Sequence, residues 1–235
     1  MVGQWRKGDS MFHYVKDGDF LSRMKSDVAD TVNRLVQRIN NDGFMSVRSE
    51  LVGSGRRKLI TQNASEPVDI DYNLVIEWCD QNKFGSYDGR RIKEYVKSVF
   101  DSVLQGKKEE PSDDSTSCLS SKKYYFNDCK NKTEFGIDLA ILKEDSFGNL
   151  HRLIHQKTGF VSYDQWFWNQ VPNSREIFSR AEAIRQKGLW GKVERAYLDK
   201  KNMYLTRNDF NHPSFICFVE AVNEVDYSLK SRMVY

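Results

Sequence analysis

The chain of 235 residues contains few cysteines and histidines and no long apolar run. Its four cysteines, Cys79, Cys118, Cys129 and Cys217, lack the paired spacing of a zinc site, so we expect free thiols in a reducing cytoplasm. No apolar run is long enough for a membrane-spanning helix, and the N-terminal residues lack the apolar segment of a signal peptide. The four histidines are scattered and predict neither a metal site nor a Ser-His-Asp triad. The sequence therefore predicts a cytoplasmic protein with no membrane partner.

Neither sign of charge dominates the composition. Lys and Arg number 36 against 33 Asp and Glu, which gives a formal net charge of +3. Because broad DNA binding depends on neutralising many phosphates, so small an excess argues against it. A local group of Lys and Arg could still hold a triphosphate or an RNA end.

Three aspartates lie in two segments that have the character of strands. Residues 68–76 are rich in β-branched and aromatic side chains and follow a turn-prone stretch at 63–67, so we expect a strand over 68–77. Side chains two apart in a strand share a face, so Asp69 and Asp71 project together while Ile70 points to the core. Asp138 lies in a similar predicted strand at 134–143. If the two strands are neighbours, three carboxylates share one small volume.

Such a cluster of carboxylates is costly unless a cation binds it. Two like charges about 4 Å apart repel by roughly 4 kcal/mol at an effective dielectric constant near 20. Carboxylates, together with water and phosphate oxygens, suit Mg²⁺ or Mn²⁺. Two such ions about 3.5–4 Å apart would activate an attacking hydroxyl and stabilise a leaving pyrophosphate. The cluster therefore indicates a two-metal site for in-line nucleotidyl transfer.

A glycine-rich triplet precedes the first two acids. Gly53, Ser54 and Gly55 form a predicted loop at 53–55 between a predicted strand at 44–52 and a possible short helix at 56–60. Glycines let backbone N–H groups approach a triphosphate, and a serine hydroxyl adds another donor. An ordinary glycine turn is the alternative interpretation of the triplet, and solvated acids on an exposed strand are the alternative for Asp69 and Asp71. The order of the pieces and their strand context favour the functional interpretation.

This arrangement resembles the nucleotidyltransferase superfamily that includes DNA polymerase β. The shared pattern is an apolar residue, Gly53-Ser54, a spacer, Asp69-x-Asp71 and the later Asp138, and it covers about half of the chain. The spacer is slightly longer than usual. The resemblance implies an α+β fold, with a core of mixed sheet flanked by helices, and metal-dependent transfer of an NMP from an NTP to an acceptor hydroxyl with release of pyrophosphate. It implies that Asp69 and Asp71 bind both metals, that Asp138 completes the metal that activates the acceptor, and that Gly53 and Ser54 hold the triphosphate.

The hydrophobic pattern predicts a core over residues 1–160 and a small helical lobe over 161–235. In the core we expect the elements already named, together with a helix at 19–40, a helix at 90–105, a mobile loop at 107–121 and a further strand at 150–155. From about residue 162 the pattern turns helical, and helices are expected to end at Gly188 and to span 190–204 and 213–227.

Four residues of the lobe are candidate nucleotide contacts. Lys200 and Lys201 are cations that could neutralise phosphates, with a solvated helix face as the alternative. Ser214 and Phe215 follow Pro213, and this segment is similar to a helix start in the oligoadenylate synthase and cyclic GMP-AMP synthase branch of the superfamily. By that resemblance Ser214 contacts the triphosphate and Phe215 stacks on a base, while a place for Phe215 in the core is the alternative.

The acceptor is open, because one nucleotidyltransferase core can serve many substrates. Synthesis of a cyclic or linear oligonucleotide second messenger is the first hypothesis, favoured by the segment at 213–215. Transfer to RNA, a protein or a small molecule, as in toxin-antitoxin or resistance enzymes, is the second. A non-catalytic nucleotide-binding module is the third, and the presence of all three aspartates argues against it.

Overall fold

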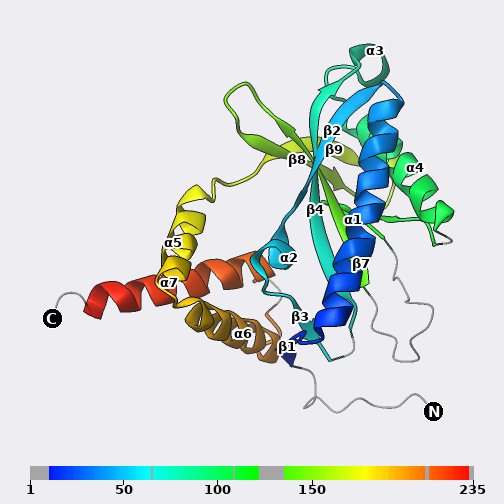
Figure 1. The fold of residues 1–235 in the computed structure, drawn as a ribbon. Coiled ribbons are helices and arrows are strands. Elements are labelled where there is room, and N and C mark those ends of the chain that lie inside the picture. Colours follow the sequence, from blue (N-terminus) through cyan, green and yellow to red (C-terminus); the bar gives the residue numbers. More distant parts are fainter. Residues whose placement is uncertain (1–10, 65, 108, 122–134, 210–211, 233–235) are drawn as a thin grey trace. The chain divides into compact units, whose positions relative to one another are not determined.

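The computed structural model of the chain describes residues 11–64, 66–107, 109–121, 135–209 and 212–232 (Figure 1). They divide into two compact units, each made of separate stretches of sequence. The sheet unit comprises Asp17–Arg56 and Pro67–Pro172. The helical unit comprises Met1–Lys16, Arg57–Glu66 and Asn173–Tyr235. Within the described residues, no helix combines the length and the apolar character that crossing a membrane requires.

The sheet unit is built on a mixed sheet of seven strands, in which β2, β4, β7, β6 and β5 are neighbours in that order and β8 joins β7 to β9. The strands are β2 (Met45–Leu51), β4 (Val68–Cys79), β5 (Asp113–Asp114), β6 (Leu119–Ser120), β7 (Phe135–Glu144), β8 (Leu150–Gln156) and β9 (Gln165–Gln170). The pairing of β4 with β7 is parallel, and the other pairings are antiparallel. A mixed sheet with helices confirms the predicted fold class.

Two long amphipathic helices, α1 (Gly18–Asn41) and α4 (Gly89–Gly106), contact each other and the strands (Figure 1). Asp17 caps α1 by accepting a hydrogen bond from the backbone N–H of Phe20 at 2.9 Å, and Gly43, with φ of 72°, follows its end. Apolar side chains recur on one face of α1 and are fully buried: Met24, Val28, Val32, Leu35 and Ile39. The sequence predicts these helices over 19–40 and 90–105. Two short helices, α3 (Gln81–Phe84) and η1 (Val161–Tyr163), lie in connections.

The segment predicted as a mobile loop at 107–121 contacts partners that are distant in sequence. Lys107 lies 2.6 Å from a carboxylate oxygen of Asp27, and Ser112 is buried. Strands β5 and β6 pair with each other, and β6 pairs with β7. The described part of this segment therefore contains two short strands where the sequence predicts only a loop.

Strand β9 overturns the helical pattern predicted from about residue 162. Its aromatic residues Trp166 and Trp168 alternate with more exposed neighbours, which is the period of a strand. Trp168 donates a hydrogen bond from Nε1 to the backbone carbonyl of Tyr87 at 2.9 Å, and Trp166 stacks on His155 with ring centroids 4.2 Å apart. These contacts extend the sheet to residue 170, past the predicted boundary at 160.

The helical unit contains α5 (Arg175–Gln186), α6 (Trp190–Thr206) and α7 (Ser214–Arg232), with a two-stranded sheet of β1 (Phe12–Tyr14) and β3 (Thr61–Asn63). Its own core is formed by buried side chains that include Leu59, Ile184, Val193, Tyr197, Phe218 and Val222. The side chain of Asn202 on α6 accepts from the backbone N–H of Phe12 at 2.7 Å and donates to its carbonyl at 3.1 Å. These bonds attach β1 to a helix that lies far away in the sequence.

Three of the four cysteines are described. Cys79, Cys118 and Cys217 are free thiols, as the sequence predicts. The same prediction for Cys129 concerns a position outside the described residues.

Candidate functional site

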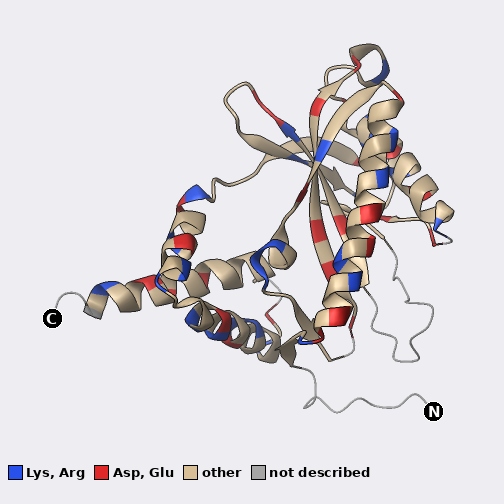
Figure 2. Cartoon of the chain, viewed as in Figure 1, with Lys and Arg blue, Asp and Glu red and all other residues tan. Residues whose placement is uncertain are grey.

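Strands β4 and β7 place the three predicted aspartates together. The strands are parallel neighbours, and Asp71 lies directly opposite Asp138, while Asp69 lies opposite Gly136. Because partners in register project to one face of a sheet, all three carboxylates share that face, which we call the acid face. Ile70, between the two acids of β4, is 1% exposed on the other side. Figure 2 accordingly shows acidic positions within two adjacent strands of the sheet.

Gly53 approaches the acid face more closely than any other residue type could. Its φ is 59°, and a Cβ atom at this position would lie 1.8 Å from Oδ2 of Asp71. The adjoining backbone is held by a hydrogen bond of 3.0 Å from the N–H of Val52 to the carbonyl of Asp71. Glycine is therefore required by both its backbone conformation and the space available.

The predicted loop at 53–55 is instead the first turn of a short helix, α2 (Gly53–Arg57). The backbone N–H of Arg56 donates to the carbonyl of Val52 at 3.2 Å, so helical bonding begins directly after β2. Gly55 is buried, and a Cβ there would lie 3.2 Å from Cδ1 of Leu51. The loop prediction is wrong because this turn packs tightly against the end of β2, which the glycines make possible.

A second glycine beside the acids was not singled out in the sequence. A Cβ at Gly136 would lie 3.4 Å from Oδ1 of Asp69 and 3.2 Å from the backbone carbonyl of Ser121. Glycine within a strand is often a sign that another group approaches closely, and its place two residues before Asp138 is the available signal. Gly136 leaves the space beside Asp69 free of a side chain of its own.

Ser120 is a further residue that sequence reasoning missed. It lies on β6 opposite Asp138, and its Oγ donates a hydrogen bond of 2.6 Å to Oδ1 of that carboxylate. The segment around it is polar and was predicted to be mobile, so nothing local pointed to this contact. Only the pairing of β6 with β7 places Ser120 beside Asp138.

The donor set of the acid face fits a hard divalent cation. Three carboxylates offer oxygen ligands, and Gly53 and Gly136 present no side chain beside two of them. Among the described residues, no group of three or more His, Cys, Asp or Glu side chains is placed so that it could hold a metal ion. Mg²⁺ is usually held by one or two carboxylates together with water and substrate phosphates, so an open acid face agrees with its chemistry.

The two predicted lysines of the helical unit point to different partners. Nζ of Lys200 lies 3.1 Å from a carboxylate oxygen of Glu224 on α7. Nζ of Lys201 donates to Oγ1 of Thr61 at 2.8 Å and lies 3.8 Å from the ring centroid of Phe12. The structure therefore does not gather these cations into one cluster.

Ser214 and Phe215 form the first turn of α7. Ser214 is exposed, whereas Phe215 is partly buried and packs against the core of the helical unit. Its ring centroid lies 6.3 Å from those of both Phe178 and Phe218. The guanidinium of Arg57 lies over the Phe218 ring at 4.5 Å. The core interpretation of Phe215 thus has support, and its role toward a base stays a prediction.

Comparison with known proteins shows which fold this is. No model of a known protein family matches the chain, and no curated protein does so either. Among solved structures, CdnC of Escherichia coli MS115-1 with ATP matches over 92% of this chain with a TM-score of 0.57 and 12% identity. The chain has the fold of the CD-NTases. This finding confirms the predicted resemblance to nucleotidyltransferases of the polymerase β type at the level of fold.

Two further CD-NTase structures have lower scores, so the likeness to CdnC carries the assignment of the fold. Elizabethkingia meningoseptica CdnE, a cyclic dinucleotide synthase solved with GTP and Apcpp, has a TM-score of 0.48 and 13% identity over 85% of this chain and 68% of its own. Bradyrhizobium diazoefficiens CdnG with GTP has a TM-score of 0.43 and 13% identity over 70% of this chain. The chain spans 62% of the length of CdnC and 42% of that of CdnG.

Proposed function

We propose that this chain is a metal-dependent nucleotidyltransferase that moves an NMP from an NTP to an acceptor hydroxyl and releases pyrophosphate. The observation that carries the proposal is the register of β4 and β7, which sets Asp71 opposite Asp138 with Asp69 on the same face. The fold shared with CdnC, a protein solved with ATP, supports a nucleoside triphosphate as the substrate.

Each residue of the acid face has a proposed task. Asp69 and Asp71 would hold two divalent ions, and Asp138 would complete the site on the side of the acceptor. When bound, such ions lower the pKa of the acceptor hydroxyl and stabilise the charge on the leaving pyrophosphate. The acceptor oxygen forms a bond to the α-phosphorus, and the bond from that phosphorus to the β-phosphate oxygen breaks. The acceptor proton passes to the Asp138 carboxylate or to water.

Gly53 would keep the phosphate side of the site open. Its backbone lies against the carboxylate of Asp71 without a side chain, and Ser54 follows in the same turn. Triphosphate oxygens could therefore approach both the backbone and an ion held by Asp71. Lys200, Lys201, Ser214 and Phe215 remain proposed nucleotide contacts of the helical unit.

A second nucleotide is the acceptor that we propose, which would make the product a cyclic or linear oligonucleotide signal. The segment Pro213-Ser214-Phe215 at the start of α7 favours it, through its resemblance to a helix start in the oligoadenylate synthase and cyclic GMP-AMP synthase branch. Transfer to RNA, a protein or a small molecule would use the same acid face.

The experiment incubates the protein with each radiolabelled NTP and Mg²⁺ or Mn²⁺, with and without cellular RNA. A labelled product formed from NTPs alone supports the signal synthase, and label on RNA or protein supports transfer to a macromolecule. The double variant Asp69→Ala with Asp71→Ala should lose all turnover, whereas Asp19→Ala, at an exposed acid of α1, should keep it. Full pyrophosphate release by the double variant would rule out the assignment.

A further inference from the structure

We propose that Ser120 is a positioning residue for Asp138, whose hydroxyl fixes the orientation of that carboxylate at the acid face. The inference rests on the proposed function, because it concerns the metal-facing role of Asp138. Its basis is the 2.6 Å hydrogen bond from Ser120 Oγ to Asp138 Oδ1. This length is typical of a hydroxyl that donates to an ionised carboxylate.

The direction of this hydrogen bond is set by chemistry. An ionised carboxylate only accepts, so the Ser120 hydroxyl must donate to it. One oxygen of Asp138 is then engaged with Ser120, and Oδ2 is left for a ligand on the acid face. Carboxylates that bind metals are commonly oriented by such a partner behind them.

Two neighbours support Ser120 from behind. Its Oγ lies 3.4 Å from Oγ of Ser115 and 3.5 Å from Sγ of Cys118. Burial and the negative charge of Asp138 raise the pKa of the Cys118 thiol, so the thiol stays protonated and can act as a weak donor. A donor behind Ser120 leaves the serine proton available for Asp138.

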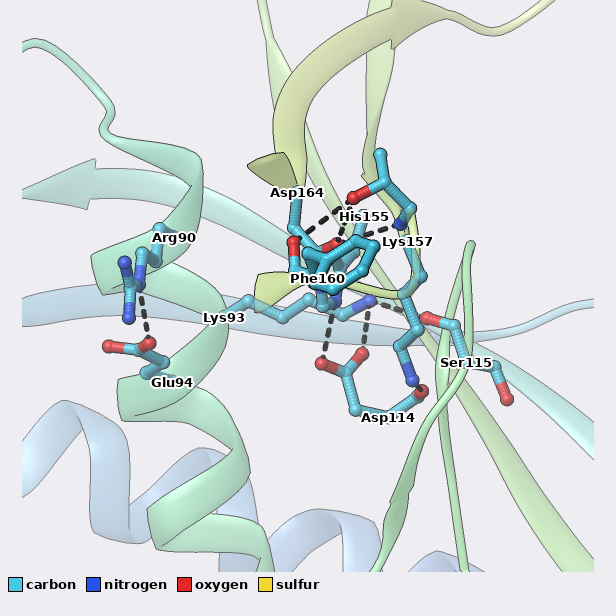
Figure 3. A network of polar contacts seen from close by, with 10 residues as sticks. Arg90, Lys93, Glu94, Asp114, Ser115, His155, Lys157, Phe160 and Asp164 are labelled. Carbon is cyan, nitrogen blue, oxygen red and sulfur yellow. Dashed lines mark hydrogen bonds and ion pairs between the residues drawn. The ribbon is translucent and has the colours of Figure 1, made fainter. Parts of the chain in front are cut away.

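The segment that carries Ser120 is held in place by a network of polar contacts that includes buried side chains (Figure 3). Asp114 on β5 lies between Nζ of Lys93 at 2.6 Å and Nδ1 of His155 at 2.8 Å. Nε2 of His155 lies 3.1 Å from Asp164, and Trp166 stacks on the imidazole. The side chain of Lys93 is 3% exposed and that of His155 is 7% exposed. Shifting the segment would leave these buried groups without their partners, which is unfavourable.

The backbone of the segment is tied down along its length. Lys93 donates from Nζ to the carbonyl of Ser115 at 2.6 Å, and the N–H of His155 donates to the carbonyl of Thr116 at 2.8 Å. After Ser120, the backbone N–H of Ser121 donates to the carbonyl of Ile137 at 2.9 Å. The Oγ atom of Ser121 accepts a hydrogen bond from the N–H of Ile137 at 2.8 Å. Ser120 is therefore presented to Asp138 from a fixed backbone.

The test compares the Ser120→Thr and Ser120→Val variants, which have nearly the same shape and differ in the hydroxyl. Ser120→Ala is the simple deletion, and Ser98→Ala, at an exposed position on α4, is the control. Binding of Mn²⁺ is followed through the paramagnetic resonance signal of free Mn²⁺. Pyrophosphate release is measured against Mg²⁺ and NTP concentrations. Circular dichroism confirms that each variant is folded.

Removing the hydroxyl should weaken Mn²⁺ binding and lower kcat at limiting Mg²⁺ by about 10-fold each, the effect typical of a lost partner behind a metal ligand. The KM for NTP should stay within about twofold, and Ser120→Thr should restore most of both losses. If Thr and Val variants bind Mn²⁺ equally and turn over equally, the inference is wrong while the proposed function stands. If the wild-type protein neither binds Mn²⁺ nor releases pyrophosphate, the proposed function fails and the inference fails with it.

Discussion

Replacing Gly53 by alanine places a methyl group where the carboxylate of Asp71 already lies. The added Cβ would be 1.8 Å from Oδ2, 2.6 Å from Cγ and 2.9 Å from Cβ of Asp71. Rotating the carboxylate would relieve the first two contacts but not the third. The turn and β4 would therefore have to separate slightly, and Asp71 would leave its position opposite Asp138.

The size of the effect follows from two separate costs. A left-handed backbone, with φ of 59° at Gly53, costs an alanine about 1–2 kcal/mol of stability. The Asp71 carboxylate must move by about 1 Å to reach an acceptable contact, and a 1 Å misplacement at an active site can cost about 100-fold in rate. That loss corresponds to roughly 2.7 kcal/mol of transition-state stabilisation. We therefore expect pyrophosphate release to fall about 100-fold with a modest loss of stability.

Gly43→Ala is the matched control for this prediction. Gly43 also has a positive φ, of 72°, but nothing lies within 4 Å of a Cβ at that position. In urea unfolding Gly43→Ala should lose only the cost of its backbone conformation, and Gly53→Ala should lose more because its Cβ also collides with Asp71. Only Gly53→Ala should lose activity in a coupled pyrophosphate assay. If Gly53→Ala keeps a rate within about threefold of Gly43→Ala, the contact between the turn and Asp71 has no catalytic consequence.

Three further predictions concern stability and can be checked by urea unfolding. Gly89→Ala should lower the free energy of unfolding by about 1–3 kcal/mol, because its Cβ would lie 2.6 Å from a leucine methyl on β8. An unchanged urea midpoint would contradict this. Phe218 is 1% exposed in the core of the helical unit. Phe218→Ala should therefore lower the free energy of unfolding by about 3–5 kcal/mol, and a loss below about 1 kcal/mol would argue against that core. Burial would raise the pKa of Asp101, but hydrogen bonds from Lys97 and Ser112 prevail and lower it below 3.8. The advantage of wild type over Asp101→Asn should therefore be complete above about pH 4 and vanish as the pH falls through the folded-state pKa; an advantage independent of pH from 3 to 7 would refute it.

The long elements of the sheet unit could be predicted because each carries its own pattern. Apolar residues recur every three or four positions in α1, and the helix expected at 19–40 occupies Gly18–Asn41. The strand expected at 68–77 occupies Val68–Cys79, with its two aspartates on one face and Ile70 buried. A period of two was sufficient to place Asp69 and Asp71 together.

The elements that escaped prediction are those ordered by remote partners. Strands β5 and β6 have two residues each, and their acidic and polar composition is typical of a loop until Lys93 and His155 are placed beside Asp114. The register that sets Asp71 opposite Asp138 depends on packing across the sheet, which no local pattern reports. The contacts of Gly53 and Ser120 with the acids follow from that packing as well.

The helical unit imposes an order on biosynthesis, because its pieces leave the ribosome at widely separated times. Phe12 on β1 bonds to Asn202 on α6, 190 residues later in the chain. At about 5–20 residues per second, translation of that interval takes roughly 10–40 s. The strands of the sheet unit are complete once Gln170 has been made, so the nascent chain can assemble the acid face first. The short β1–β3 ribbon can make its bonds to α6 only after Asn202 has been synthesised.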